Sequence, residues 1–243
     1  NGHERIIPSV VGVSPAGEWL IGTPALNQYA LYPHQTVRSV KRLMGTNQVL
    51  ALGGYQLAPH EVSALILREI KRIAEANLGH EVRQAVVTVP AYFNNAQRQA
   101  TTLAGELAGL EVARIVNEPT AAALAFGLSS AQNQTALVYD LGGGTFDVSL
   151  VEIVDGVIDV RASHGDTQLG GDDFDARVVD FLVETFSEQH GVDLRGDARA
   201  MARLRGAAEA AKIDLSARMF TWVREEYLAE KRGVPLHLEV EIS

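Results

Sequence analysis

The stretch Asp140-Leu141-Gly142-Gly143-Gly144-Thr145-Phe146-Asp147 joins two predicted strands, residues 136–141 and 146–154. Three glycines in a tight strand–strand turn let the backbone approach a ligand closely and turn successive N–H groups toward it. No Gly-Lys-Ser/Thr follows, so the turn is not a Walker loop, and Asp147 stands where a dinucleotide fingerprint needs its third glycine. The turn therefore predicts a phosphate-binding loop, and its flanking acids, Asp140 and Asp147, suit a hydrated Mg²⁺ ion. The alternative is a flexible glycine hairpin with two solvated acids.

Three other stretches carry groups that could serve such a loop. Glu118 stands at a predicted strand-to-helix junction, and Gly170-Gly171 precedes another helix, whose N-terminus could bind an anion. Glu209, Lys212 and Ser216 are three and four residues apart on one predicted helix, so they share a face and could bind a ribose or a base. Each stretch alone also has a structural explanation, as a helix start, a cap or a solvated face.

The remaining sequence predicts an α/β protein. A helix from Pro59 to a Gly79 cap is followed by alternating strands and helices up to Gly127, which predicts a sheet with parallel neighbours. Residues 1–23 predict short strands, and residues 24–58 predict helical or irregular cover. Beyond a boundary near residue 130, the expected elements are strands at 136–141, 146–154 and 157–162, helices at 172–189 and 197–215, and a final strand–turn–strand unit around Gly233. Asp155-Gly156 predicts a two-residue hairpin turn between the second and third of these strands.

The composition narrows the classes of function. The chain has 243 residues, 47% hydrophobic and 21% charged, which is typical of a globular protein, and no apolar run reaches the ~18 residues of a membrane-spanning helix. The absence of cysteine excludes disulfides, thiolate metal sites and a cysteine nucleophile. A net charge of −9 gives no chain-wide attraction to nucleic acid or anionic lipid, so neither is an expected partner. The seven histidines show no metal-ligand spacing.

Taken together, the motifs resemble a known family along nearly the whole chain. The matching stretches are residues 86–94 (VVTVPAYFN), 96–100 (AQRQA), 115–124 (IVNEPTAAAL), 139–147 (YDLGGGTFD) and 166–175 (DTQLGGDDFD). They closely resemble the ATPase domain of the seventy-kilodalton heat-shock chaperones, the DnaK-type family. The resemblance implies the two-lobed, actin-like (ribonuclease H-like) ATPase fold, with ATP or ADP and Mg²⁺ between the lobes. Residues 1–130 would form lobe I and residues 131–243 the first part of lobe II.

The resemblance also implies catalytic roles. Lys41, which the residues alone would class as a surface charge, matches the lysine that steadies the γ-phosphate and the attacking water. Glu118, Asp140 and Asp147 match acids that arrange water and metal near the phosphates, and we expect them to hold Mg²⁺ through water. Thr145 matches a threonine that is autophosphorylated in bacterial members.

Further positions match the nucleotide-binding and signalling residues of the family. Gly142, Gly143, Gly144 and Thr145 match its second phosphate loop, and Gly170 and Gly171 lie beside the nucleotide. One wall of the adenosine pocket is matched by Glu209, Lys212 and Ser216. Pro90 and Arg114 match positions implicated in signalling to the peptide-binding domain.

The implied biology is an ATP-driven chaperone of the cytoplasm and the heat-shock response. Its partners would be a J-domain co-chaperone, a nucleotide exchange factor and unfolded polypeptides, the last bound by a separate C-terminal domain. The family's first phosphate hairpin would precede Asn1 and the rest of lobe II would follow Ser243, so we expect both lobes to be incomplete and the isolated chain to be weakly active. Residues 45–57 look shorter than in many members, and Asp172 and Asn95 replace a common Glu and Asp; both replacements look mild.

Two alternatives stay open within the same fold. One is a non-catalytic scaffold that binds nucleotide or co-chaperones only; the retention of Lys41, Glu118, Asp140 and Asp147 argues against it. The other is a filament-forming or sugar-phosphorylating relative. The chaperone-like sequences of residues 86–100 and 115–124 argue against it.

Overall fold

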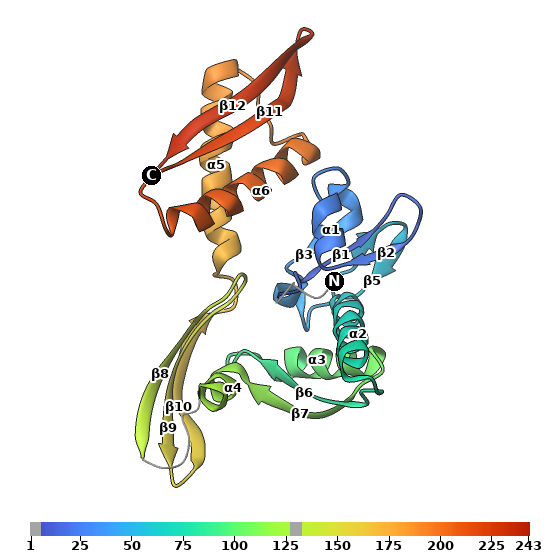
Figure 1. Ribbon diagram of the computed structural model, residues 1–243, viewed down its shortest axis with the longest axis vertical. Coiled ribbons are helices and arrows are strands. Elements are labelled where there is room, and N and C mark those ends of the chain that lie inside the picture. Colours follow the sequence, from blue (N-terminus) through green and yellow to red (C-terminus); the bar gives the residue numbers. More distant parts are fainter. Residues whose placement is uncertain (1–5, 127–132) are drawn as a thin grey trace.

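The computed structural model describes residues 6–126, the N-terminal part, and residues 133–243, the C-terminal part. In Figure 1 the N-terminal part lies on the right, and the C-terminal part runs up the left side from a three-stranded sheet to a long hairpin. The expected boundary near residue 130 falls outside the described residues. The chain is a mixed α/β protein built on several small sheets rather than one large one.

The first elements of the N-terminal part form a small antiparallel sheet in the order β2-β1-β3, followed by a separate hairpin. These elements are β1 (Val10–Val13), β2 (Trp19–Ile21), α1 (Thr23–Gln28), the 3₁₀ turn η1 (Pro33–Gln35), β3 (Thr36–Arg38), the 3₁₀ turn η2 (Val40–Leu43), β4 (Leu50–Leu52) and β5 (Tyr55–Leu57). Val11, Leu52 and Val62 are fully buried at the centre of this layer. Residues 24–58 were expected to be helical or irregular, and α1 and the two 3₁₀ turns agree with this. The segment also contains three strands that were not expected, each only three residues long and so too short to show an alternating pattern.

The second set of elements in this part alternates helix and strand, as predicted. It consists of α2 (Pro59–Leu78), β6 (Gln84–Val89), α3 (Asn95–Leu107), β7 (Glu111–Asn117) and α4 (Glu118–Ala125). Strands β6 and β7 pair in parallel, which confirms the expected arrangement. Asn94 caps α3 in a reciprocal capping box with Gln97. Asn117 takes the N-cap position of α4, but its side chain accepts a hydrogen bond from Arg98 rather than capping the helix.

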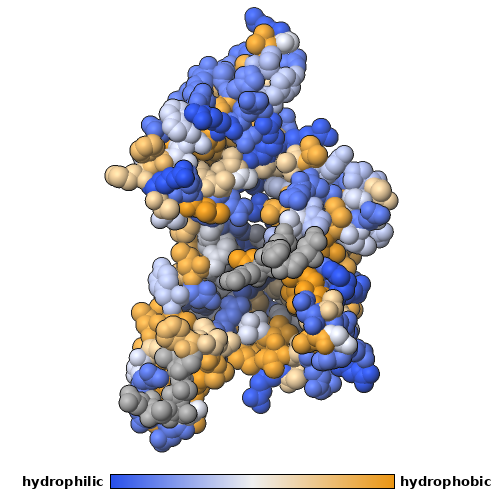
Figure 2. Space-filling model, in the orientation of Figure 1, coloured by the Kyte–Doolittle hydropathy of each residue, from blue (hydrophilic) through white to orange (hydrophobic). Residues whose placement is uncertain are grey.

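The C-terminal part begins with an antiparallel meander, β8 (Gln134–Leu141), β9 (Phe146–Val154) and β10 (Val157–Asp166). The predicted Asp155-Gly156 hairpin is confirmed: both residues have positive φ, 51° and 79°, as a tight two-residue hairpin turn requires. Strand β10 continues to Asp166, four residues beyond its predicted end. Leu137 and Tyr139 on β8 are exposed, and Figure 2 shows hydrophobic residues gathered over this end of the molecule.

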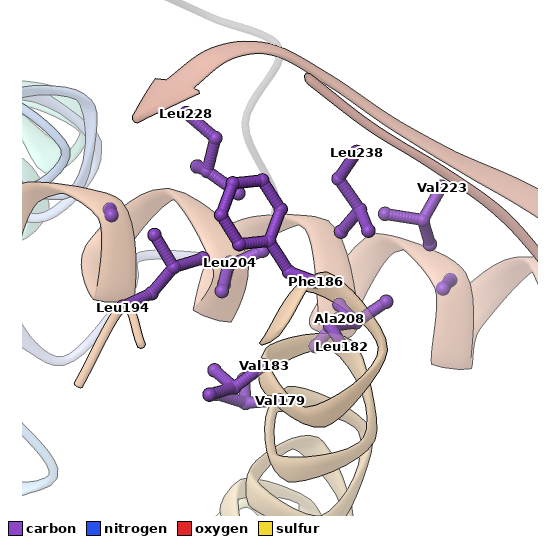
Figure 3. Close-up of a cluster of buried hydrophobic side chains, with 12 residues drawn as sticks. Val179, Leu182, Val183, Phe186, Leu194, Leu204, Ala208, Val223, Leu228 and Leu238 are labelled. Atoms are coloured by element: carbon purple, nitrogen blue, oxygen red, sulfur yellow. The ribbon is translucent and has the colours of Figure 1, made fainter. Parts of the chain in front are cut away.

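The other elements of the C-terminal part pack around one apolar core. They are α5 (Gly171–His190), α6 (Ala198–Leu215), β11 (Thr221–Lys231) and β12 (Val234–Ile242). Phe186, Leu182 and Leu204 are fully buried between the two helices and the hairpin, and Leu238 closes the cluster from β12 (Figure 3). Among the residues that the structure describes, no helix combines the length and the apolar character that crossing a membrane would need.

Candidate functional site

The glycine turn lies between the paired ends of β8 and β9. Its two flanking acids face each other across the sheet, because Asp140 is the register partner of Asp147. The N–H of Gly142 donates to the carbonyl of Thr145 at 2.9 Å, which closes the turn, and the Thr145 side chain is buried. The sequence-predicted loop is therefore a tight hairpin connection with both acids at its base.

The second glycine pair lies directly against this turn. Gly171 donates its N–H to the carbonyl of Gly142 at 2.9 Å, and Asp172 donates to the carbonyl of Gly143 at 2.8 Å. A Cβ on Gly170 would lie 2.6 Å from the carbonyl carbon of Gly143, so no side chain fits there without moving the backbone. The structure thus unites two glycine motifs about 28 residues apart in the chain into one backbone surface at the start of α5.

Arg42 joins the N-terminal part to this surface. Its Nε donates to the carbonyl of Gly144 at 2.9 Å, and its guanidinium forms an ion pair with Asp173 at 2.5 Å. The hydroxyl of Ser39 donates to the carboxylate of Asp172 in the same region. Sequence reasoning missed Arg42 and Ser39; the only available signal was that both lie within two residues of Lys41, which the family resemblance singles out.

Lys41 is not an isolated surface charge. Its Nζ lies 2.9 Å from Oε1 of Glu118, which joins η2 to the first residue of α4. The lysine side chain remains 46% exposed and the glutamate 20%, so the pair is open to solvent on the lysine side. A cation held by one acid and still accessible can turn to a second anion, such as a phosphate, at low cost.

Asp147 is the most unusual charge in the site. Its side chain is 3% exposed, and its Oδ1 has no hydrogen-bond partner within the described residues. Burial raises the pKa of Asp147 above its ordinary value, and the neighbouring charges of Glu118 and Asp140 raise it further. Lys41 and the backbone N–H of Tyr92 offset part of this rise in pKa. The site therefore holds more negative charge than its own cations neutralise, which favours a bound cation.

The acids do not form a direct ligand set. In residues 6–126 and 133–243, no group of three or more histidine, aspartate or glutamate side chains is placed to hold a metal ion. Asp140, Asp147 and Glu118 are nonetheless close enough for the charges of Asp140 and Glu118 to raise the pKa of Asp147. This donor set fits a Mg²⁺ ion that keeps most of its water ligands and meets the carboxylates through them.

One cavity of about 490 Å³, the central cavity, brings most of these groups together. Its lining includes Lys41, Glu118, Asp140, Gly142, Gly143, Gly144, Thr145, Asp172 and Glu209. Gly170 and Gly171 support the lining from behind through their contacts with the glycine turn. Both parts of the chain contribute to the wall, so the cavity depends on how they meet.

The predicted adenosine-wall residues have separate environments. Glu209 lines the central cavity, whereas Lys212 reaches back to Asp175 at 2.7 Å and to the carbonyl of Gly171 at 3.1 Å. The hydroxyl of Ser216 donates to the carbonyl of Lys212 within its own helix. Lys212 therefore connects α6 to the second glycine pair and fixes the position of that loop.

Pro90 and Arg114 lie away from the central cavity. Pro90 is buried at the end of β6 and Arg114 is exposed on β7. Beside Pro90, Arg98 donates to the carbonyl of Phe93 at 2.9 Å and to Oδ1 of Asn117 at 2.8 Å, which ties the loop after β6 to the residue before Glu118.

Comparison with known proteins identifies the family. A model of the Hsp70 protein family matches residues 1–52 and 47–243. The chain belongs to the Hsp70 family. It is 56% identical to the chaperone protein DnaK of Thermotoga neapolitana over 241 residues, 54% to that of Thermotoga maritima, and 53% to that of Thermosipho africanus over 240 residues. These alignments cover 98% of this chain and 40% of each relative, so the chain spans well under half the length of the Hsp70 proteins it matches.

Proposed function

We propose that this chain is the nucleotide-binding part of an Hsp70 chaperone, which binds ATP or ADP with Mg²⁺ and hydrolyses ATP in the intact protein. The observation that carries the proposal is the central cavity, where a two-loop glycine surface meets the Lys41–Glu118 pair beside the unneutralised Asp147. The two parts of the chain would belong to lobes I and II of an actin-like ATPase, with the nucleotide between them.

The role proposed for each group is the one that the family resemblance implies. The backbone of Gly142–Thr145 would bind the phosphates, and Lys41 would neutralise charge on the terminal phosphate and orient the attacking water. Glu118, Asp140 and Asp147 would hold the metal through water, and the metal would offset the unfavourable burial of the Asp147 charge. When bound, Mg²⁺ supplies positive charge to the phosphates. Glu209, Lys212 and Ser216 would form one side of the adenosine site, and Thr145 would be available for phosphorylation only when the buried turn opens.

The proposal extends to the whole protein. The relatives are named chaperones, and we propose that the intact protein couples nucleotide state to the binding and release of unfolded polypeptides. A J-domain co-chaperone and a nucleotide exchange factor would be its regulatory partners. Pro90 and Arg114 would take part in signalling to the peptide-binding domain. A cytoplasmic location stays a prediction.

Calorimetric titration of Mg·ATP and Mg·ADP into the chain tests nucleotide binding directly. We expect saturable binding that is lost when the metal is chelated. A folded chain that binds neither nucleotide would reject the proposal for this chain.

Hydrolysis is tested in the intact protein with Lys41→Ala. We expect nucleotide binding to persist while single-turnover hydrolysis falls by about 100-fold, since removal of one charge-stabilising group typically costs that much. Lys231→Ala is a matched control, because Lys231 bonds only a backbone carbonyl on α5, that of His190, among the contacts that the structure describes. Turnover unaffected by the loss of Lys41 would reject the role proposed for Lys41. Binding without any turnover in the unmodified protein would favour the non-catalytic scaffold.

A further inference from the structure

The β11–β12 hairpin contains a bulge opposite His237. The register shifts between Glu225 and Ala229, so residues 226–228 of β11 lie opposite the single residue His237 of β12. A bulge takes backbone N–H and C=O groups out of the hydrogen-bond ladder of the sheet, and each of these groups then needs another partner. The hairpin lies at the opposite end of the molecule from the β8–β10 sheet (Figure 1).

Two side chains supply partners for the backbone of this bulge. Nδ1 of His237 accepts the backbone N–H of Tyr227 at 3.0 Å. Arg203 of α6 donates to the carbonyl of Tyr227 at 3.1 Å and to the carbonyl of Glu226 at 2.7 Å. Tyr227 itself has φ 50°, a left-handed conformation that is costly for a bulky residue. The shape of the bulge therefore depends on the bonds made by His237 and Arg203.

The bulge brings Leu228 into the core of the C-terminal part. Val223 and Leu228 are five residues apart, so in a regular strand they would point to opposite faces of the sheet. Both are 4% exposed and belong to the cluster around Phe186 (Figure 3). Tyr227, the residue next to Leu228, is 56% exposed. A change in the bulge would thus affect both a core contact and the outer surface of the hairpin.

The bond from Tyr227 is possible in only one charge state of His237. A neutral imidazole can offer Nδ1 as an acceptor, whereas an imidazolium carries a proton on both ring nitrogens and can only donate. A proton on Nδ1 would face the N–H of Tyr227, and the bond would be lost. Histidine is the side chain whose charge ordinarily changes between pH 5 and 8, and His237 is exposed to solvent.

The other titratable groups around His237 do not share this dependence. From α5, Nε2 of His190 lies 3.0 Å from the carbonyl of His237, and this nitrogen can donate whether or not His190 is charged. The hydrogen bond to Glu230 raises the pKa of the Tyr227 phenol above its ordinary value, so the phenol stays neutral. The remaining charged groups nearby are four acids and three bases: Glu225, Glu226, Glu230, Glu239, Arg203, Arg224 and Lys231. Carboxylates, guanidinium groups and amines ordinarily keep their charge where histidine titrates.

We propose that the bulge of residues 226–228 is a pH-sensitive element, held by His237 when its imidazole is neutral and released when the imidazole is protonated. Release removes one of the two side chains that hold the bulge, loosens the anchor of Leu228 and changes the outer surface around Tyr227. The bond requires a neutral imidazole, so the folded hairpin binds fewer protons than the unfolded one, and its stability rises with pH in this range. The inference goes beyond the proposed function, because nothing in it requires the central cavity.

Amide hydrogen exchange, followed by nuclear magnetic resonance, tests the element at the donor itself. The exchange rate of the Tyr227 N–H is divided into its intrinsic rate at the same pH, which gives a protection factor. In the unmodified chain we expect protection to fall about fivefold between about pH 7.5 and about pH 5.5, the value for one net hydrogen bond. His237→Asn offers an acceptor oxygen that does not titrate, so its protection should not change with pH. His237→Phe keeps a ring without an acceptor and should show low protection at both pH values.

Two further variants separate the histidines. His190→Gln keeps an amide donor for the carbonyl of His237 and should retain the pH response of the unmodified chain. His80→Asn is the matched control, because His80 lies in the N-terminal part and among the described residues bonds only the carbonyl of Glu81. It should also retain the response. Protection of Tyr227 that does not change with pH in the unmodified chain would overturn the inference. A fall of the same size in His237→Asn, or a response that is lost in His190→Gln, would overturn it as well.

Discussion

Replacement of Gly170 by alanine tests whether the two glycine loops must touch. The added Cβ would lie 2.6 Å from both the carbonyl carbon and the oxygen of Gly143 and 2.7 Å from the oxygen of Gly142. Carbon atoms pack at about 3.5–4.0 Å, so the loops would have to separate by about 1 Å. All three contacted atoms belong to backbone, so no side-chain rotation can relieve the overlap.

The cost can be worked from these contacts. Overpacking of this kind typically costs about 1–3 kcal/mol. Separation would also stretch the two hydrogen bonds from Gly171 to Gly142 and from Asp172 to Gly143, each with a net value of about 1 kcal/mol. We therefore expect a loss of about 2 kcal/mol or more in the free energy of unfolding, which is a fall in Tm of about 4–8 °C for a chain of this size. Because the same loops would hold the phosphates, Mg·ADP affinity should fall by about tenfold or more.

The assays are a thermal melt and a calorimetric Mg·ADP titration on the same preparations. Gly196→Ala is the control: its Cβ would meet nothing within 4 Å and its φ is not in the left-handed range. It should melt and bind like the unmodified chain. A Gly170→Ala protein with unchanged Tm would show that the loops part freely, and the idea of one rigid backbone surface would then be wrong.

Three more substitutions give distinct outcomes. Asp147→Asn removes a buried charge whose oxygen lacks a hydrogen-bond partner, and burying that charge costs about 1 kcal/mol of stability. The substitution should therefore raise Tm at neutral pH by about 2–4 °C, and it should weaken Mg·ADP binding. This gain in Tm should vanish in melts at acidic pH, because below the raised folded-state pKa of Asp147 the unmodified carboxyl is neutral as well. A gain in Tm that does not depend on pH would contradict the presence of a buried charge at Asp147. Phe186→Ala should cost about 3–5 kcal/mol in chemical denaturation, since the ring is fully buried in the core of Figure 3, and a loss below 1 kcal/mol would contradict that packing. Gly206→Ala, inside α6 with open space at its Cβ, should stabilise by about 0.5–1 kcal/mol in the same assay, and destabilisation would argue against a continuous helix there.

The sequence was sufficient wherever structure follows from neighbouring residues. Pro59 and Gly79 bound α2, and Asp155-Gly156 forms the predicted hairpin. These residues act on the backbone conformation of their immediate neighbours, so the structure they form can be predicted without knowledge of distant contacts. The glycine turn belongs to the same class, because its shape follows from the three glycines and the strands on either side.

The contacts that assemble the site are of another kind. Arg42 reaches Asp173 across 131 positions, and Arg38 reaches Glu209 across 171. No local pattern marks an exposed arginine as one that will cross between the parts of a chain. Lys41 was assigned by resemblance alone for the same reason. Asn117 shows that a local pattern can also mislead. An asparagine directly before a helix is a typical cap, but the side chain of Asn117 instead accepts a hydrogen bond from Arg98.

The way the two parts meet explains why charge should govern the site. The larger apolar clusters lie wholly inside one part or the other. Among the described residues, one small cluster of buried side chains joins them, Ala123 of α4 against Val151 and Ile153 of β9. Other contacts between the parts, among them those of Arg38, Ser39, Arg42 and Tyr29, are polar and at least partly exposed. Apolar packing therefore fixes one end of the interface, while the cavity end closes through ion pairs of low individual strength. Because the contacts at the cavity end are polar, we expect the charges of a bound nucleotide and its metal to shift the balance between a more open and a more closed cavity.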